Sequence, residues 1–275
     1  MNFDKKSSWQ EYPVVAFDTE TSGAYPLESE IIELGAVKWF QGEIVGKFQT
    51  LLKPSKELVP DNIRIHGITN EMVADAPFMK DQVAAFREFI DGSILLAHHA
   101  PFDLGFLTID IENAKLQFPN NIHLCTSLLS RGLLTTTNHK LQTLVKELKL
   151  TGGDAHRAYD DAYACLQVFF KCVEKLDAPV SLERLLEVQK KSIEWVNYKI
   201  SESNDKKLLR LAEAIRGQQS LNIIYEGGQT KGKARPITPH GIVRNPDGDY
   251  INAFCGLDNQ RKRFYIEKII EIVEG

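Results

Sequence analysis

Four carboxylates and one histidine lie in three apolar-flanked segments, at a spacing that suits metal-assisted chemistry on a phosphodiester. They are Asp18 and Glu20 in AFDTETSG, Asp103 in LLAHHAPFD, and His156 and Asp161 in HRAYDDA. Hard carboxylate oxygens select Mg²⁺ or Mn²⁺ over zinc. Each motif is weak by itself. Together, and in this order, they predict a site for two divalent metal ions.

The first two acids, Asp18 and Glu20, follow an apolar run of strand length, YPVVAFDTE. Residues two apart in a strand point to the same face, so both carboxylates should face one site. Alone, such a pair is also typical of solvated acids at a strand end. The following Thr21, Ser22 and Gly23 add hydroxyls and backbone N–H groups that suit a phosphate or sugar, which favours a substrate site.

The other two acids are expected in the first turns of helices, Asp103 just after Pro101 and Asp161 in HRAYDDA. Taken singly, each is better explained as an acid favoured by the helix dipole. His156 precedes Asp161 by five residues, and on one continuous helix the two would diverge by roughly 140°. We therefore expect His156 before the helix, acting as a general base, and the neighbouring Asp160 on a solvated face.

The elements that must position these residues form a mixed α/β pattern. Three strand-like runs, YPVVAFDTE, IIELGAVKWF and GEIVGKFQTLLKP, come first, with a hairpin turn at Gln41-Gly42. A helix-like run MKDQVAAFREFI, a buried strand SILLAH and the helix HRAYDDAYACLQVFFKCVEKL follow. This order predicts a mixed central sheet flanked by helices.

The rest of the chain contains two further segments, one mostly helical and one rich in β-strands. Residues 181–217 are expected to be mostly helical, interrupted by the polar break SESNDKK, and to brace two domains rather than form a free linker or a dimer seam. Beyond Gly217, short strand-like runs and turns predict a small β-rich module. A length of 275 residues suits two domains.

Charge and composition add weaker constraints. Residues 1–205 carry 21 basic and 29 acidic side chains, a net charge of −8. Residues 206–275 carry 12 basic and 8 acidic side chains, a net charge of +4, which brings the whole chain to −4. This suits metals in the first part and a polyanion at the second, but ordinary surface charge explains it equally well. The cysteines lack metal-binding spacing, and no apolar run reaches the roughly 18–20 residues of a membrane span or forms a signal core. A cytoplasmic protein with reduced thiols is expected.

The motifs D-x-E-T-S, H-x-A-x-F-D and H-x-x-x-x-D resemble the signature of the DEDDh family of 3′–5′ exonucleases, over about residues 10–176. The resemblance implies a ribonuclease H-like fold, in which the four acids position two Mg²⁺ or Mn²⁺ ions. It also implies that His156 takes a proton from the attacking water. The product would be a nucleoside 5′-monophosphate released from a free 3′ end.

Two further segments bear on the substrate. IRIHGIT resembles the family's stretch that packs on the terminal nucleotide, which implies contacts from Ile65 and His66. The chain departs from the family at His99, where an Asn usually follows the motif histidine, here His98. An imidazole cannot copy both hydrogen-bonding functions of an amide, so substrate preference is in question while the metal-ligand geometry should survive.

Residues 206–275 resemble the WYL domain, a small Sm-like β-barrel, although its naming triplet reads DYI here. The resemblance implies that Arg235, Tyr250 and Arg263 bind single-stranded nucleic acid or a nucleotide ligand. Cationic and aromatic groups together suit phosphate contact and base stacking. The alternative is a barrel that only packs on the nuclease.

These observations predict a two-metal 3′–5′ exonuclease at residues 10–176, a helical linker or brace at 177–205 and a WYL-like domain at 206–275. The alternative is a ligand-responsive, nucleic-acid-binding regulator built on a silent nuclease. A lost catalytic residue would favour that alternative, and none is lost. The sequence does not decide whether the substrate is DNA or RNA, because no residue is identified as contacting the 2′-hydroxyl that distinguishes them.

Overall fold

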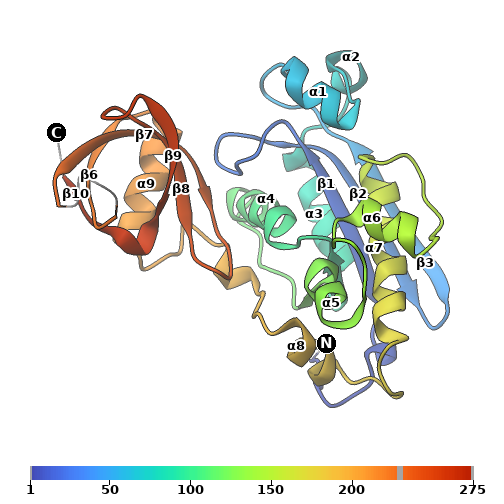
Figure 1. Cartoon of the computed structure of the whole chain (residues 1–275). Helices are drawn as coiled ribbons and strands as arrows, with labels where there is room; N and C mark the ends of the chain where they lie inside the picture. Colours follow the sequence, from blue (N-terminus) through green and yellow to red (C-terminus); the bar gives the residue numbers. More distant parts are fainter. Residues whose placement is uncertain (1, 228–231, 274–275) are drawn as a thin grey trace.

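The computed structural model describes residues 2–227 and 232–273, and it folds into two bodies (Figure 1). The first is built on a five-stranded sheet of order β3-β2-β1-β4-β5. Strands β1, β2 and β3 are antiparallel, while β4 and β5 run parallel to β1. The predicted mixed sheet is therefore confirmed. The strands are β1 Val14–Thr21, β2 Ile31–Phe40, β3 Glu43–Leu51, β4 Ile94–Ala97 and β5 Ile122–Cys125.

The turn between β2 and β3 confirms the predicted hairpin. Gln41 and Gly42 have φ angles of 49° and 94°. Two successive residues with positive φ match the twist of the flanking strands, which is why short hairpins favour a glycine at the second position.

Helices cover both faces of this sheet, because β1 is apolar on both sides. Val15 and Phe17 belong to a core with α3 and α4, whereas Val14 and Ala16 belong to a second core with α5, α7 and α8. The helices of this body are α1 Pro60–His66, α2 Asn70–Val73, α3 Met79–Ile90, α4 Pro101–Asn113, α5 Thr126–Leu133, α6 Leu141–Glu147, α7 Ala158–Val173 and α8 Leu182–Gln189, with a 3₁₀ turn at Trp9–Glu11.

A glycine allows α7 to approach the sheet closely. A Cβ atom at Gly35 would lie 2.2 Å from the backbone nitrogen of Tyr159, in the first turn of α7. Gly35 is the β2 partner of Asp18 on β1. The close approach therefore brings the start of α7, with Asp161, up to the strand that carries Asp18.

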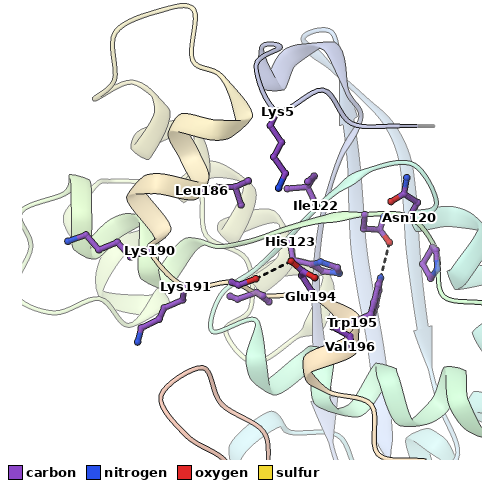
Figure 2. Close-up of a pocket in the computed structure, with 14 residues that line it drawn as sticks. Lys5, Asn120, Ile122, His123, Leu186, Lys190, Lys191, Glu194, Trp195 and Val196 are labelled. Carbon is purple, nitrogen blue, oxygen red and sulfur yellow. Dashed lines mark hydrogen bonds between the residues drawn. The ribbon is translucent and has the colours of Figure 1, made fainter. Parts of the chain in front are cut away.

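The expected helix through residue 200 is wrong beyond α8. That helix ends at Gln189, where Lys190 takes a left-handed φ of 61°, and residues 190–205 contain only a 3₁₀ turn at Trp195–Asn197. Tertiary packing explains the break. Ile193 and Trp195 are buried in the core of the first body, and the Trp195 indole N–H donates to Asn121 Oδ1 at 3.3 Å (Figure 2).

The second body, orange to red in Figure 1, is an antiparallel sheet curved around a helix. Its strand order is β10-β6-β7-β8-β9. Asp205 caps the helix by accepting hydrogen bonds from the N–H groups of Lys207 and Leu208. The prediction of a small C-terminal β domain is confirmed. Its elements are α9 Lys206–Arg216, β6 Leu221–Tyr225, β7 Ala234–Val243, β8 Tyr250–Cys255, β9 Gln260–Tyr265 and β10 Ile269–Val273, with a 3₁₀ turn at Ile266–Lys268.

The two bodies meet at the loop between β1 and β2. The Tyr25 hydroxyl of this loop accepts a hydrogen bond from Asn252 Nδ2 on β8 at 2.5 Å. The Tyr25 ring covers Gly241 on β7, where a Cβ atom would lie 2.2 Å from its Cγ. Ile109 of α4 is buried in the core of the second body. The second body therefore contacts both the loop that follows Glu20 and the helix that carries Asp103.

All four cysteines are buried and unpaired. Among the helices of the described part of the chain, none has the length and apolarity needed to cross a membrane.

Candidate active site

The four predicted acids come from three elements that meet at one end of the sheet. Asp18 and Glu20 lie on β1, Asp103 in the first turn of α4, and Asp161 in the first turn of α7. Asp103 is buried, and its Oδ1 accepts hydrogen bonds from the backbone N–H and hydroxyl of Thr19 at 3.1 and 2.8 Å. Thr19, between the two β1 acids, thus holds α4 against β1.

Glu20, His156 and Asp161 form a compact group. One potential ligand atom from each lies within 4.8 Å of the others. The His156 backbone N–H donates to Asp161 Oδ2 at 3.1 Å, and Gln142 Nε2 donates to Asp161 Oδ1 at 2.8 Å. Both oxygens of Asp161 are therefore fixed in direction by neighbouring donors.

His156 lies where the spacing predicts, in the loop before α7. Its φ of 62° turns the chain just before the helix, and the side chain is exposed. An exposed imidazole next to a group of carboxylates is placed to exchange protons with solvent. Its role as general base stays a prediction.

An ion pair that the sequence did not suggest fixes the start of α7. The fully buried Glu33 on β2 accepts hydrogen bonds from Arg157 Nε and Nη2 at 3.0 and 2.8 Å and from the Ala158 N–H at 3.1 Å. Burial opposes ionisation, but the hydrogen bonds from Arg157 and Ala158 outweigh it and hold the Glu33 pKa below its ordinary value. The only available signal was a charged residue inside the apolar run IIELGAV, where a buried charge requires a partner.

The acids of the site raise one another's pKa. Burial, then the charges of Asp103 and Glu20, place the Asp18 pKa well above its ordinary value. Burial, then the charge of Asp161, raises the Glu20 pKa to about 8. Burial also raises the pKa of Asp103 to about 7 and that of Asp161 above its ordinary value. A divalent cation would relieve this repulsion, so the all-oxygen donor set fits Mg²⁺ or Mn²⁺.

Two predicted substrate contacts, Thr21 at the end of β1 and Ser22 directly after it, form hydrogen bonds within the loop beside the site. The Thr21 hydroxyl donates to the Gly23 carbonyl at 2.7 Å, and Ser22 Oγ accepts from the Glu30 N–H at 2.9 Å. The Asn62 side-chain amide donates to the Ser22 carbonyl. Both hydroxyls therefore already shape this loop.

Ile65 and His66 lie at the end of a helix, α1. Ile65 is 60% exposed, whereas His66 is buried and its Nδ1 accepts from the Ile68 N–H at 3.0 Å. Burial lowers the pKa of His66, and the charges of Glu33 and His156 also act on it. His66 is therefore within electrostatic range of Glu33 and His156, while Ile65 faces outward.

The two histidines after β4 differ in role. His98 bridges Thr126 Oγ1 and the His139 carbonyl, each at 2.9 Å, and burial lowers its pKa to about 4. His99 is exposed and has a left-handed φ of 75°. Asn and His both tolerate this conformation better than most residues. The departure from the usual Asn is therefore compatible with the backbone.

In the second body, the structure separates the three predicted ligand contacts. Tyr250 and Arg263 lie on the outer face of β8 and β9, with the guanidinium 4.0 Å from the tyrosine ring centre. Arg235 is buried on the inner face, where it pairs with Asp258 at 3.0 Å and lies 5.5 Å from the Phe264 ring centre. Arg235 therefore has protein partners on the inner face, and its role in ligand binding stays a prediction.

A hollow of about 440 Å³ lies near Lys5, the start of β5 and the segment 190–196 (Figure 2). In Figure 2, Lys190 and Lys191 point away from His123 and Trp195. None of the predicted catalytic residues lines this hollow. Its size therefore does not make it the candidate active site.

Two family models match the chain, an exonuclease model (RNase_T) over residues 15–169 and the WYL domain over 206–273. Among curated relatives, the PolC-type DNA polymerase III of Thermotoga petrophila is 35% identical over 68% of this chain, but only 14% of that relative is covered. The DNA polymerase III subunit epsilon of Treponema pallidum is 33% identical over 64% of this chain and 89% of that subunit.

Solved structures show the same fold. Exonuclease X, in complex with 5′ overhanging duplex DNA, is 26% identical over 64% of this chain and 98% of its own, with a TM-score of 0.50. Escherichia coli exonuclease I, in complex with a dA16 oligonucleotide, is 15% identical and has a TM-score of 0.54 over 88% of this chain and 55% of its own. The matched model over residues 15–169 and the assembled motifs place the chain in the exonuclease family of the DEDDh 3′–5′ type, with a WYL domain behind the nuclease.

Proposed function

We propose that this protein is a metal-dependent exonuclease that removes nucleoside 5′-monophosphates from the 3′ end of DNA. Asp18, Glu20, Asp103 and Asp161 would hold two Mg²⁺ or Mn²⁺ ions, with His156 as general base. The observation that carries the proposal is the meeting of these four carboxylates with an exposed histidine at one end of the sheet.

Two bound divalent ions would supply positive charge that attracts the phosphodiester, activates the attacking water and stabilises the leaving 3′ oxygen. The chain's own residues hold the reacting groups in position and exchange protons with them. His156 accepts the proton of the water and passes it to solvent, since its side chain is exposed. The Glu33–Arg157 ion pair and the hydrogen bond from the His156 N–H to Asp161 hold the histidine over the acids.

DNA is the favoured substrate, because the relatives matched over the nuclease region are named as DNA polymerase III subunits. The chain covers 14% of the PolC-type relative, so polymerase partnership is not carried over.

The WYL domain is proposed to hold the single strand that leads to the active site. Tyr250 and Arg263 offer a stacking surface with a cation over it, and Tyr265 lies next to Tyr250 with ring centres 6.0 Å apart. Stacking on aromatic side chains tolerates any base sequence. Exonuclease I, whose structure was solved with dA16, shares the fold over 88% of this chain and thus into the second body.

A silent nuclease serving as a regulator's scaffold is the less favoured function. Such a protein has no need to keep every ionisable group of the site, whereas all four acids and the histidine stand together here. The burial of mutually repelling acids also costs stability, which a purely structural role does not explain.

The test compares two neighbouring substitutions on α7, Asp161→Asn and Asp160→Asn. Both remove one negative charge from the first helical turn, but Asp160 Oδ2 accepts a hydrogen bond from the backbone N–H of Asp154 at 3.0 Å and is not one of the four proposed ligands. With single-stranded DNA and Mg²⁺ or Mn²⁺, Asp161→Asn should lower kcat at least about a hundredfold. Asp160→Asn should stay within about threefold of the unsubstituted protein. Equal activity in the two variants would refute the assignment.

A further inference from the structure

The outer face of β8 and β9 carries more aromatic and cationic side chains than Tyr250 and Arg263 alone. Three cross-strand pairs share this face: Tyr250 with Tyr265, Asn252 with Arg263, and Phe254 with Arg261. Side chains alternate between the two faces of a strand, and Ile251 and Ala253, which lie between these positions on β8, are buried in the core. The outer face is therefore continuous from Tyr250 to Phe254.

Phe254 and Arg261, at the far end of this face, have no role assigned so far. Phe254 is 38% exposed, which leaves part of its ring open to stacking. Arg261 is exposed and directly opposite on β9, so its side chain lies beside the Phe254 ring. Tyr250 and Phe254 are four residues apart on one strand, which separates the two positions by about 13 Å.

The cations of this face are available to a polyanion. Within residues 2–227 and 232–273, neither Arg261 nor Arg263 forms an ion pair with a carboxylate. Two acids near the ends of β8 each pair with another cation: Asp249 with Arg244 at 2.6 Å, and Asp258 with Lys262 at 2.5 Å. Phosphate groups would supply the negative charge that the two guanidinium groups lack.

The nuclease touches this face close to its own active site. Tyr25 lies over Gly241, the β7 partner of Asn252, and the Tyr25 hydroxyl accepts the hydrogen bond from Asn252. Tyr25 follows Glu20 by five residues, and five residues of chain span at most about 18 Å. In Figure 1, β8 and β9 lie on the side of the second body that faces α4. A strand whose 3′ end lies among the acids can therefore reach the face.

We propose that Phe254 and Arg261 form a second stacking position for single-stranded DNA, besides the position at Tyr250 and Arg263. Each position offers an aromatic ring to a base and a guanidinium to a phosphate. One strand would occupy both positions, pass Asn252 between them, and continue past Tyr25 into the nuclease. The inference rests on the proposed function, because it names the residues with which the WYL domain holds the substrate.

The test measures binding and cleavage separately, with the full chain. Binding is titrated in EDTA with 5′-labelled oligothymidylates of about four to about sixteen nucleotides, at several salt concentrations. Cleavage is measured with Mg²⁺ on a thymidine dinucleotide, which fills the active site alone. The variants are Phe254→Ala and Arg261→Gln. Their matched controls are Ile270→Ala, at a 59% exposed position on β10, and Arg216→Gln, at an exposed position on α9.

Phe254→Ala should weaken binding of the longer strands about fivefold or more, as expected for the loss of one stacked base. Arg261→Gln should reduce the slope of log K against log salt concentration by about 0.7, the value for one phosphate contact on a single strand. Both variants should cleave the dinucleotide at the unsubstituted rate. Ile270→Ala and Arg216→Gln should leave the affinity and the salt slope unchanged.

The proposal is overturned if no strand binds in EDTA at low salt, or if Phe254→Ala and Arg261→Gln bind the longer strands as the unsubstituted protein does. Equal losses in the two controls would overturn it too, because the effect would then not belong to this face. A failure of the proposed function is distinguishable. Absence of cleavage with Mg²⁺ and Mn²⁺ would refute the exonuclease, while strand binding in EDTA would still be measurable.

Discussion

The carboxylate of Glu33 and the guanidinium of Arg157 form a two-pronged ion pair, with N···O distances of 2.8 and 3.0 Å, across 124 residues of sequence. Arg157 lies next to His156 and four residues before Asp161. The pair therefore joins the middle of the sheet to the segment that carries two of the proposed catalytic groups. Its carboxylate is fully buried, which leaves it no alternative partner in water.

We predict that Glu33→Gln lowers kcat about ten- to a hundredfold while KM changes little. The amide cannot accept both hydrogen bonds of the guanidinium, so the start of α7 would shift, and small shifts of catalytic groups are costly. The free energy of unfolding should fall by about 1–3 kcal/mol. Steady-state kinetics and urea unfolding measure both effects. Glu43→Gln, at an exposed hairpin position, is the control. An unchanged kcat in Glu33→Gln would show that the ion pair is only structural.

Replacing one proposed metal ligand should separate activity from stability. We expect Asp18→Asn to reduce the release of monophosphates at least about a thousandfold, because one oxygen ligand and one negative charge are lost. In EDTA the same variant should be more stable than the unsubstituted protein, since burial and four neighbouring acids oppose ionisation of Asp18. Thermal unfolding in EDTA measures this. A variant that is both inactive and less stable would indicate damage to the fold instead.

The stability of the metal-free protein should fall as the pH rises. The Glu20 pKa is raised from 4.5 to about 8, and that of Asp103 from 3.8 to about 7. Between these values the folded protein binds more protons than the unfolded chain, so stability decreases with pH across about pH 4 to 8. Thermal unfolding in EDTA across this range should show a falling Tm, with a smaller slope in Glu20→Gln.

Metal ions should reverse this pH effect. At saturating Mn²⁺ or Mg²⁺ we expect the Tm to rise by about 5 °C or more at pH 8, and by less at pH 5, where the acids keep protons that compete with the metal. Calorimetry at the two pH values measures the difference. An equal metal effect at both values would argue against these acids as the ligands.

The contact between Tyr25 and Gly241 should determine how firmly the two domains are joined. In Gly241→Ala the added Cβ atom would lie 2.2 Å from Tyr25 Cγ, so the loop must move away. We expect the free energy of unfolding to fall by about 1–3 kcal/mol. Proteolysis between residues 190 and 205 should also be faster. Gly217→Ala, where the nearest contact of an added Cβ is 3.3 Å, is the control. Equal proteolysis of both variants would show that the contact contributes little.

The sequence predicted the candidate site well where the chemistry depends on local spacing. The two β1 acids, the first-turn positions of Asp103 and Asp161, and His156 in the loop before α7 all follow from local geometry. The residues that orient them were missed. Glu33, Gln142 and Thr19 act across contacts between elements distant in sequence, which no local pattern contains.

The fold was predicted least well where tertiary packing overrides local preference. SIEWVNYKI has helical spacing, but Ile193, Trp195 and Tyr198 are buried in the nuclease core and draw the chain out of the helix. Arg235 shows the same limit in a β-sheet. The resemblance to the WYL domain implied a ligand contact there, but whether a side chain faces inward depends on register, and Arg235 lies on the inner face with Asp258.

The most direct test of the central claim is to follow a single-stranded DNA with a different label at each end, with Mg²⁺ or Mn²⁺ and with EDTA. We predict a metal-dependent ladder that retains the 5′ label and shortens one nucleotide at a time from the 3′ end, with nucleoside 5′-monophosphates as the products. A matched RNA strand would report the preferred sugar. Shortening from the 5′ end, internal cuts, or no cleavage of DNA or RNA with either metal would contradict the account.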